Sequence, residues 1–179
     1  MKNDSRQNLR LSVISALFAA LSAVFVYFFH IPNVIGGYIH IGDAIIYLCA
    51  SVLPVSYAAT AGAVGFAIAD LLSGYPYYML PSAIIRVIVV LLFTSKREKI
   101  VCKRNIIALP FAVIITTGLY ALTKYVLYYF IQNMPEIAGV KALASIPGNI
   151  IQCTVSSVLY IAVSIAMDKL DFKKKYFGG

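Results

Sequence analysis

Residues 11–29 read LSVISALFAALSAVFVYFF, an apolar run without a single charged side chain. A helix that crosses a hydrocarbon core of about 30 Å needs about 20 such residues, so this run predicts a transmembrane helix. In the whole chain of 179 residues, 61% are hydrophobic and 12% are charged, against about 45–50% and about 25% in soluble domains. This composition excludes an ordinary cytosolic enzyme, a disordered chain and a disulfide scaffold, and it predicts an integral membrane protein.

Further apolar runs follow the first, separated by short loops with proline, glycine or charged residues. Because backbone in lipid must satisfy its own hydrogen bonds, we predict an all-α integral membrane bundle of six transmembrane helices in one domain, residues 1–179. The predicted helices span approximately residues 10–29, 40–53, 56–73, 79–95, 106–131 and 138–168. The second is short enough to be interfacial or re-entrant, and Pro147 with Gly148 interrupts the last.

The basic residues predict the orientation of this bundle. Twelve of the 15 lysines and arginines fall in the N-terminal tail, the loop 95–105 and the C-terminal tail, which six spans place on one side. Cytoplasmic segments carry such an excess of positive charge, so both termini are predicted to be cytoplasmic. The same distribution attributes the net charge of +8 to membrane topology and argues against affinity for nucleic acid.

Eight polar or ionisable residues lie in or beside the apolar runs, mostly toward the predicted outer side. The set comprises Asp43, Asp70, Tyr75, Tyr78, Arg86, Lys124, Asn149 and Gln152. A charge at mid-bilayer costs about 2.5–3.5 kcal/mol on insertion scales, so such residues mark functional positions. Their concentration predicts a substrate pocket that opens to the outside.

Structural explanations stay open beside this one. Asp43 can cap the N-terminus of the second helix or interact with its dipole, and Asp70 can form an ion pair with Arg86. The two amide side chains can form interhelical hydrogen bonds, and the tyrosines can belong to an interfacial belt. His30 and His40 are expected to be loop or interface residues, since no further metal ligands lie at a suitable spacing.

Small residues form two adjacent lines along the first helix. The lines are Ser12, Ala16 and Ala20, and Ser15, Ala19 and Ala23. Small residues four positions apart let another helix approach closely in lipid. The lines predict either a docking face for another protein or packing within the bundle.

Catalytic motifs are missing from the sequence. It contains no HExxH, GxSxG, Walker-type loop or CxxC. We therefore predict that the protein is no enzyme and uses no cofactor or metal. Without an ATP site, the chain can drive uptake only with a partner or an ion gradient. An intramembrane enzyme is a further alternative, but it would need a nucleophile–base pair that the sequence does not offer.

Four segments together carry a resemblance to a known family. They read GYIHIGDAIIYL (37–48), AGAVGFAIADLLSGY (61–75), PSAIIR (81–86) and PGNIIQ (147–152). In their order and spacing they resemble the substrate-binding S-components of energy-coupling factor (ECF) vitamin transporters, in the riboflavin or hydroxymethylpyrimidine subgroup. This subgroup often has lysine where the chain has Arg86, and the exchange turns a point charge into a planar fork.

The resemblance implies a six-helix bundle in a prokaryotic plasma membrane that captures a vitamin or vitamin precursor from outside. It implies that the bundle topples against a transmembrane coupling subunit, with two cytosolic ATPase subunits driving release. It places the eight polar residues around the substrate and the small lines of the first helix at the coupling subunit. The absence of tryptophan argues against a thiamine-type pocket. Hydroxymethylpyrimidine-like, pyridoxine-like or riboflavin-like molecules are the predicted substrates, and a stand-alone secondary carrier is the alternative.

Overall fold

The computed structural model describes residues 2–32 and 38–177, and helices dominate it. The helices are α1 (Lys2–Phe28), α2 (Asp43–Val52), α3 (Val55–Leu72), α4 (Met79–Val90), α5 (Lys103–Val126), α6 (Pro135–Lys169) and α7 (Phe172–Phe177). A 3₁₀ turn, η1 (Pro76–Tyr78), precedes α4, and a π-helical turn, η2 (Leu127–Ile131), extends α5. The all-α prediction is confirmed, with a helix in each of the six predicted apolar runs.

Among the described residues, four helices are long and apolar enough to cross a membrane. They cover Ser5–Phe28, Val55–Leu72, Lys103–Ile131 and Pro135–Lys169. At about 1.5 Å per residue, the ten residues of α2 reach only about half of a hydrocarbon core. The twelve residues of α4 are also short. The structure therefore supports four full spans, and the prediction of six full spans remains untested.

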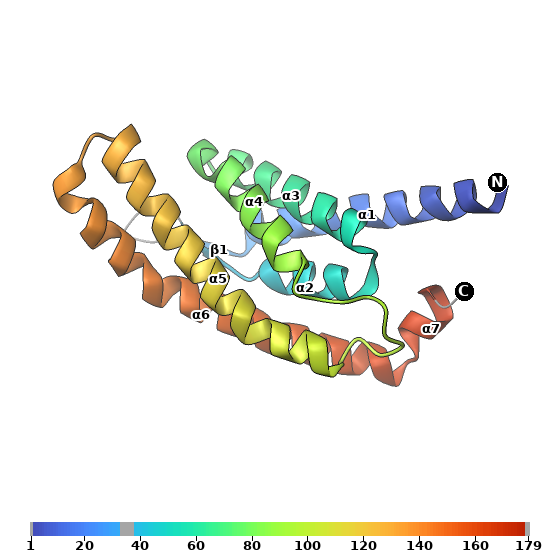
Figure 1. The fold of residues 1–179 in the computed structure, drawn as a ribbon. Helices are drawn as coiled ribbons and strands as arrows, with labels where there is room; N and C mark the ends of the chain where they lie inside the picture. Colours follow the sequence, from blue (N-terminus) through green and yellow to red (C-terminus); the bar gives the residue numbers. More distant parts are fainter. Residues whose placement is uncertain (1, 33–37, 178–179) are drawn as a thin grey trace.

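The last two predicted helices differ from their expected form. Helix α6 is continuous for 35 residues and passes through Pro147, so the predicted interruption does not break it. A proline inside a helix removes one backbone hydrogen bond and favours a bend, and α6 follows a curved path beside α5 (Figure 1). As a result α6 is the longest element of the described residues.

The segment before α2 contains the only strands of the described residues. Strands β1 (His30–Pro32) and β2 (Tyr38–His40) pair in antiparallel fashion, with His30 opposite His40. No alternation of apolar and polar residues predicts a hairpin there. This hairpin delivers the chain to the first turn of α2 and so positions Tyr38 and His40 over the bundle.

Close helix packing depends on small residues, as expected for helices in lipid. Helix α3 contacts both α1 and α4, and α5 contacts α6. A Cβ atom at Gly65 would lie 2.6 Å from the backbone oxygen of Ala19, so only glycine allows this approach of α3 to α1. Deeper in the core, the rings of Tyr47 and Phe93 stack at 5.1 Å between centroids, and Tyr160 meets both edge-on.

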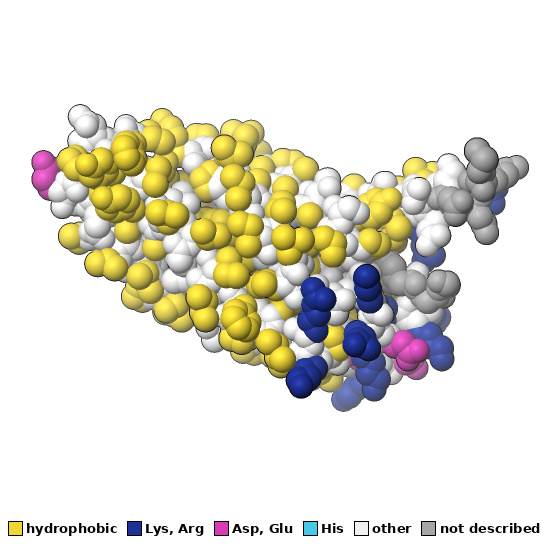
Figure 2. All heavy atoms as spheres, in the orientation of Figure 1, with side chains coloured by type: hydrophobic (Ala, Val, Ile, Leu, Met, Phe, Trp, Pro, Cys, Tyr) yellow, Lys and Arg dark blue, Asp and Glu magenta, His cyan; other side chains and the backbone are white. Residues whose placement is uncertain are grey.

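The two ends of the bundle differ in charge. The start of α1 and helix α7 lie at the same end of the molecule (Figure 1), where Arg10 donates a hydrogen bond to the backbone oxygen of Tyr176. Figure 2 shows lysine and arginine side chains gathered at this end and hydrophobic side chains over most of the remaining visible surface. We call it the basic end, and its residues include Arg97, Lys103 and Arg104.

Candidate binding site

Three of the predicted site residues meet inside the bundle. An Arg86 Nη1 atom from α4 lies 2.7 Å from Oδ1 of Asp43, the first residue of α2, and both side chains are fully buried. Gln152 of α6 donates a hydrogen bond from Nε2 to Oδ2 of Asp43 at 2.8 Å. The carboxylate thus joins three helices that are far apart in sequence. Asp43 does occupy the first turn of α2, as the helix-terminus alternative required, but its side chain does not cap the helix.

The guanidinium of Arg86 is held by aromatic side chains as well. It lies 4.2 Å from the ring centroid of Phe66, a distance at which cation and ring attract each other. Its Nη2 atom donates to the hydroxyl of Tyr120 at 3.2 Å. The Nε atom of Arg86 is buried and has no hydrogen-bond partner among the described residues. A buried charged donor that lacks a partner is costly, so this atom is a candidate contact for a ligand.

Asp70 has a partner other than the predicted one. The hydroxyl of Tyr38 donates a hydrogen bond to Oδ1 of Asp70, while Arg86 forms its ion pair with Asp43. The alternative of an Asp70–Arg86 ion pair is therefore wrong. The hairpin brings Tyr38 to Asp70, and the start of α2 brings Asp43 to Arg86. The second oxygen, Oδ2 of Asp70, is buried without a hydrogen-bond partner in the described residues.

Aromatic rings surround Tyr38 at the end of the bundle opposite the basic residues. The Tyr38 ring lies 5.1 Å from Tyr75, and Tyr75 lies 6.4 Å from Tyr78. We call this region the tyrosine end. Burial, reinforced by the nearby Asp70 carboxylate, raises the pKa of Tyr38, so its hydroxyl stays protonated and can donate.

His40 is buried at the tyrosine end, and the expectation that it is a loop or interface residue is wrong. Its backbone N–H donates to Oε1 of Gln152 at 3.2 Å, and its Nδ1 atom accepts from the backbone of Gly42 at 3.3 Å. Burial lowers the pKa of His40 to about 4, opposed by Asp43 and reinforced by Arg86. The imidazole is thus neutral near neutral pH. The sequence feature that pointed to His40 was its position three residues before Asp43, a predicted site residue.

The remaining predicted residues stand outside these contacts. Lys124 is buried in the last turn of α5, and Asn149 of α6 carries a buried Nδ2 atom with no hydrogen-bond partner among the described residues. Tyr120 and Phe66, which contact Arg86 directly, were missed by the sequence analysis. A lone aromatic residue within an apolar run indicates only core packing, so the sequence held no signal for either.

A pocket of about 320 Å³ opens beside the tyrosines, between η1 and η2. Its lining includes Tyr75, Tyr78 and Tyr128. The hollow therefore lies at the same end as the Asp70–Tyr38 hydrogen bond. The described ranges 2–32 and 38–177 contain no group of three or more His, Cys, Asp or Glu residues that could hold a metal ion.

The two small-residue lines of α1 have different surroundings. Ser15, Ala19 and Ala23 are buried, and the Ser15 hydroxyl donates to the backbone oxygen of Tyr57 in α3 at 2.7 Å. This line belongs to packing within the bundle, so it is not available as a docking face. Ser12, Ala16 and Ala20 form the other line, which is exposed along its whole length.

In a comparison with protein families, residues 6–169 match the family described as "ECF-type riboflavin transporter, S component". The match covers nearly the whole chain, including every helix that forms the site. No curated protein and no solved structure matches the chain.

Proposed function

Because the chain belongs to the family of the S-components of ECF-type riboflavin transporters, we propose that it captures a small water-soluble vitamin or vitamin precursor from outside the cell. The observation that carries this proposal is the buried Asp43–Arg86 pair with Gln152 and the unpartnered Nε atom of Arg86. Buried polar atoms of this kind are stabilised when a ligand supplies the missing hydrogen bonds. The eight predicted site residues, including Lys124 and Asn149, line this site in the proposal.

The charges and rings of the site favour a neutral heteroaromatic ligand. Two carboxylates, Asp43 and Asp70, stand against two cations, Arg86 and Lys124, so the site as a whole carries no net charge to balance. The aromatic side chains of Tyr38 and Tyr75 offer ring faces. Riboflavin-like, hydroxymethylpyrimidine-like and pyridoxine-like molecules all combine a flat ring with hydroxyl and ring-nitrogen groups. The family favours the first, and the small pocket among the tyrosines suits the other two.

The proposed partners are a transmembrane coupling subunit and two cytosolic ATPase subunits, with release by toppling of the bundle. The exposed line Ser12, Ala16 and Ala20 is the proposed contact for the coupling subunit, since exposed small residues permit close helix approach. Ala16→Trp should abolish assembly and uptake but leave vitamin binding intact. Leu143→Trp, a change at an exposed position of α6, is the control. Normal assembly of Ala16→Trp would contradict the docking face.

The binding proposal is tested with purified protein. Mass spectrometry of co-purifying small molecules identifies the ligand class, and equilibrium titration with riboflavin, hydroxymethylpyrimidine and pyridoxine measures each affinity. Tyr38→Phe removes the hydroxyl that holds Asp70, and we expect roughly fivefold weaker binding of the preferred ligand. Tyr129→Phe, on an exposed tyrosine of η2, should bind normally. Failure of all three molecules to bind would refute the proposal.

A stand-alone secondary carrier is the second candidate. It predicts uptake by this chain without any ATPase subunit and dependence on an ion gradient. Uptake measured in cells with and without the coupling and ATPase subunits separates the two candidates directly.

A further inference from the structure

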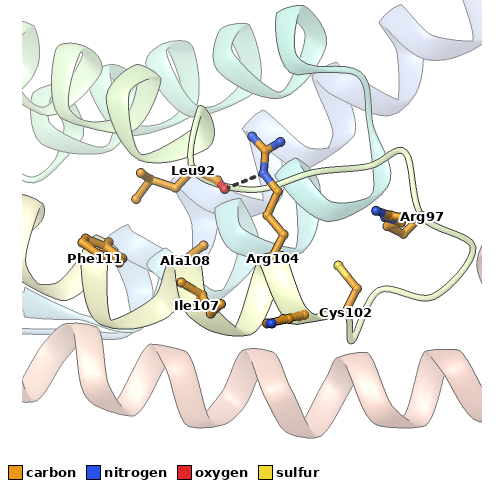
Figure 3. A pocket seen from close by; sticks show the side chains of 8 residues that line it. Leu92, Arg97, Cys102, Arg104, Ile107, Ala108 and Phe111 are labelled. Atoms are coloured by element: carbon orange, nitrogen blue, oxygen red, sulfur yellow. Dashed lines mark hydrogen bonds between the residues drawn. The ribbon is translucent and has the colours of Figure 1, made fainter.

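A hollow with a charged lining lies at the basic end, far from the proposed vitamin site. It has a volume of about 660 Å³ and lies between the chain that leaves α4 and the first turns of α5 (Figure 3). Its lining includes Arg97, Lys103 and Arg104 together with Ile107, Phe111 and Cys102. We call it the basic pocket, and we propose that it binds an anionic phospholipid, with the headgroup at the cations and the upper acyl chains along α5.

The charge of the lining is one-sided. Three of its side chains are cationic, and none of its lining residues is acidic. Arg104 is fixed in place, because its Nε and Nη2 atoms donate to the backbone oxygens of Leu92 and Leu91 at 3.2 Å each. Arg97 and Lys103 are exposed, and neither forms an ion pair with an acidic side chain among the described residues. The pocket therefore attracts an anion, because its lining has no acidic side chain to neutralise the cations.

Apolar side chains continue the pocket along a single face of α5. Lys103, Ile107 and Phe111 are spaced four residues apart, so they lie above one another over about 12 Å of helix. Ile107 is 47% exposed and Phe111 is 52% exposed. A cation at one end of a helix face and exposed apolar side chains beyond it match the order of a phospholipid, from phosphate to glycerol to hydrocarbon.

Other ligands fit this gradient less well. Inorganic phosphate would use the cations but would leave Ile107 and Phe111 without a role. A zwitterionic lipid would fill the apolar part, but its net charge is zero and it would gain less from three cations. The inference rests on the membrane location of the chain and is independent of which vitamin it binds.

A second hollow at the same end supplies a matched control. It has a volume of about 320 Å³, and Lys99 and Lys169 line it together with Asp168. The Asp168 carboxylate accepts hydrogen bonds from the backbone N–H groups of Ile100 and Val101, both at 2.8 Å. This hollow therefore has two lysines at the same end of the molecule but includes an acid and lacks an aromatic side chain in its lining. Removing its lysines changes the net charge equally.

Cys102 provides a direct probe of occupancy. It lines the basic pocket and is partly exposed, whereas Cys49 and Cys153 are buried. The full chain is placed in phosphatidylcholine bilayers with or without phosphatidylglycerol or cardiolipin, and the rate of maleimide labelling at Cys102 is measured. We expect the anionic lipids to slow labelling in proportion to their content. Cys102→Ser shows how much labelling arises elsewhere.

Charge variants decide whether the pocket is specific. Arg97→Gln combined with Lys103→Gln should weaken protection by anionic lipid about 30-fold in lipid concentration, since each interfacial cation is worth about fivefold in affinity. Lys99→Gln combined with Lys169→Gln should leave protection within about twofold of the unchanged protein. Arg104 is left unchanged because it caps α4.

Three results would overturn the proposal. Equal protection by phosphatidylcholine would show that charge plays no part, and equal protection by inorganic phosphate would assign the pocket to a free anion. Equal loss in both double variants would show diffuse attraction to the whole basic end. Vitamin titration of the same samples keeps the two proposals apart, because neither double variant touches the vitamin site.

Discussion

The tyrosine end and the basic end of this bundle use the same residue types in opposite ways. At the tyrosine end Arg86 is fully buried and pairs with Asp43. At the basic end Arg104 is exposed and caps the backbone of α4. The two carboxylates differ in the same way. Asp43 neutralises Arg86, whereas Asp168 accepts hydrogen bonds from two backbone N–H groups. The role of a charged side chain near a membrane therefore depends on its depth and on its partners.

The largest expected effect comes from breaking the buried pair. Arg86→Met leaves the Asp43 carboxylate buried without its cation, and we expect a loss of about 3–5 kcal/mol in unfolding free energy. Adding Asp43→Asn to Arg86→Met should recover most of this loss, because no unpaired charge remains. Thermal unfolding in detergent measures both.

The matched change at the other end is Arg104→Met. It removes an exposed arginine that caps backbone oxygens, so we expect a loss of about 1 kcal/mol or less. Comparable destabilisation by Arg86→Met and Arg104→Met would contradict the difference between the two ends.

Acid should destabilise the protein through His40. Burial lowers the pKa of His40 in the folded protein to about 4, below the value of about 6.5 for a free histidine. Between these two pKa values the unfolded chain binds a proton at His40 that the folded protein does not bind. The contribution of His40 to the unfolding free energy is therefore complete above about pH 6.5 and is lost as the pH falls toward 4. The full loss is about 3 kcal/mol.

The change that isolates this contribution is His40→Gln. Its unfolding free energy should fall less steeply between pH 7 and pH 4 than that of the unchanged protein, and the difference measures His40 alone. His30→Gln, at the partner position of the hairpin, should keep the original slope. Identical slopes for His40→Gln and the unchanged protein would show that His40 is not held neutral.

A smaller effect is expected from Asp168→Asn at the basic end. The amide can accept one of the two backbone N–H groups but leaves the other unsatisfied, so we expect a loss of about 1–3 kcal/mol. Vitamin affinity should not change, since Asp168 lies away from the tyrosine end.

Asp171→Asn is the control for this change. Asp171 is exposed and has a φ of 49°, a left-handed conformation that asparagine adopts readily. It should therefore be neutral in stability. A vitamin-binding defect in Asp168→Asn would show that the two ends are coupled.

The sequence predicted most of the fold but only part of the candidate site. The apolar runs predicted six helices but not α7, and they could not show that α2 has only ten residues and α4 only twelve. They also could not show that α6 continues through Pro147, because the cost of an interior proline depends on the packing around it. Asp43, Arg86 and Gln152 were predicted as site residues from their polarity in apolar surroundings, and the structure brings them into contact.

The sequence by itself determined an all-helical chain, a single basic end and a short set of polar residues inside apolar runs, since composition and periodicity are local properties. Only the tertiary structure decided that Arg86 pairs with Asp43 and not with Asp70. It also decided which small-residue line of α1 is buried against α3. Pairing depends on which helices become neighbours, and a helix's own residues do not specify its neighbour.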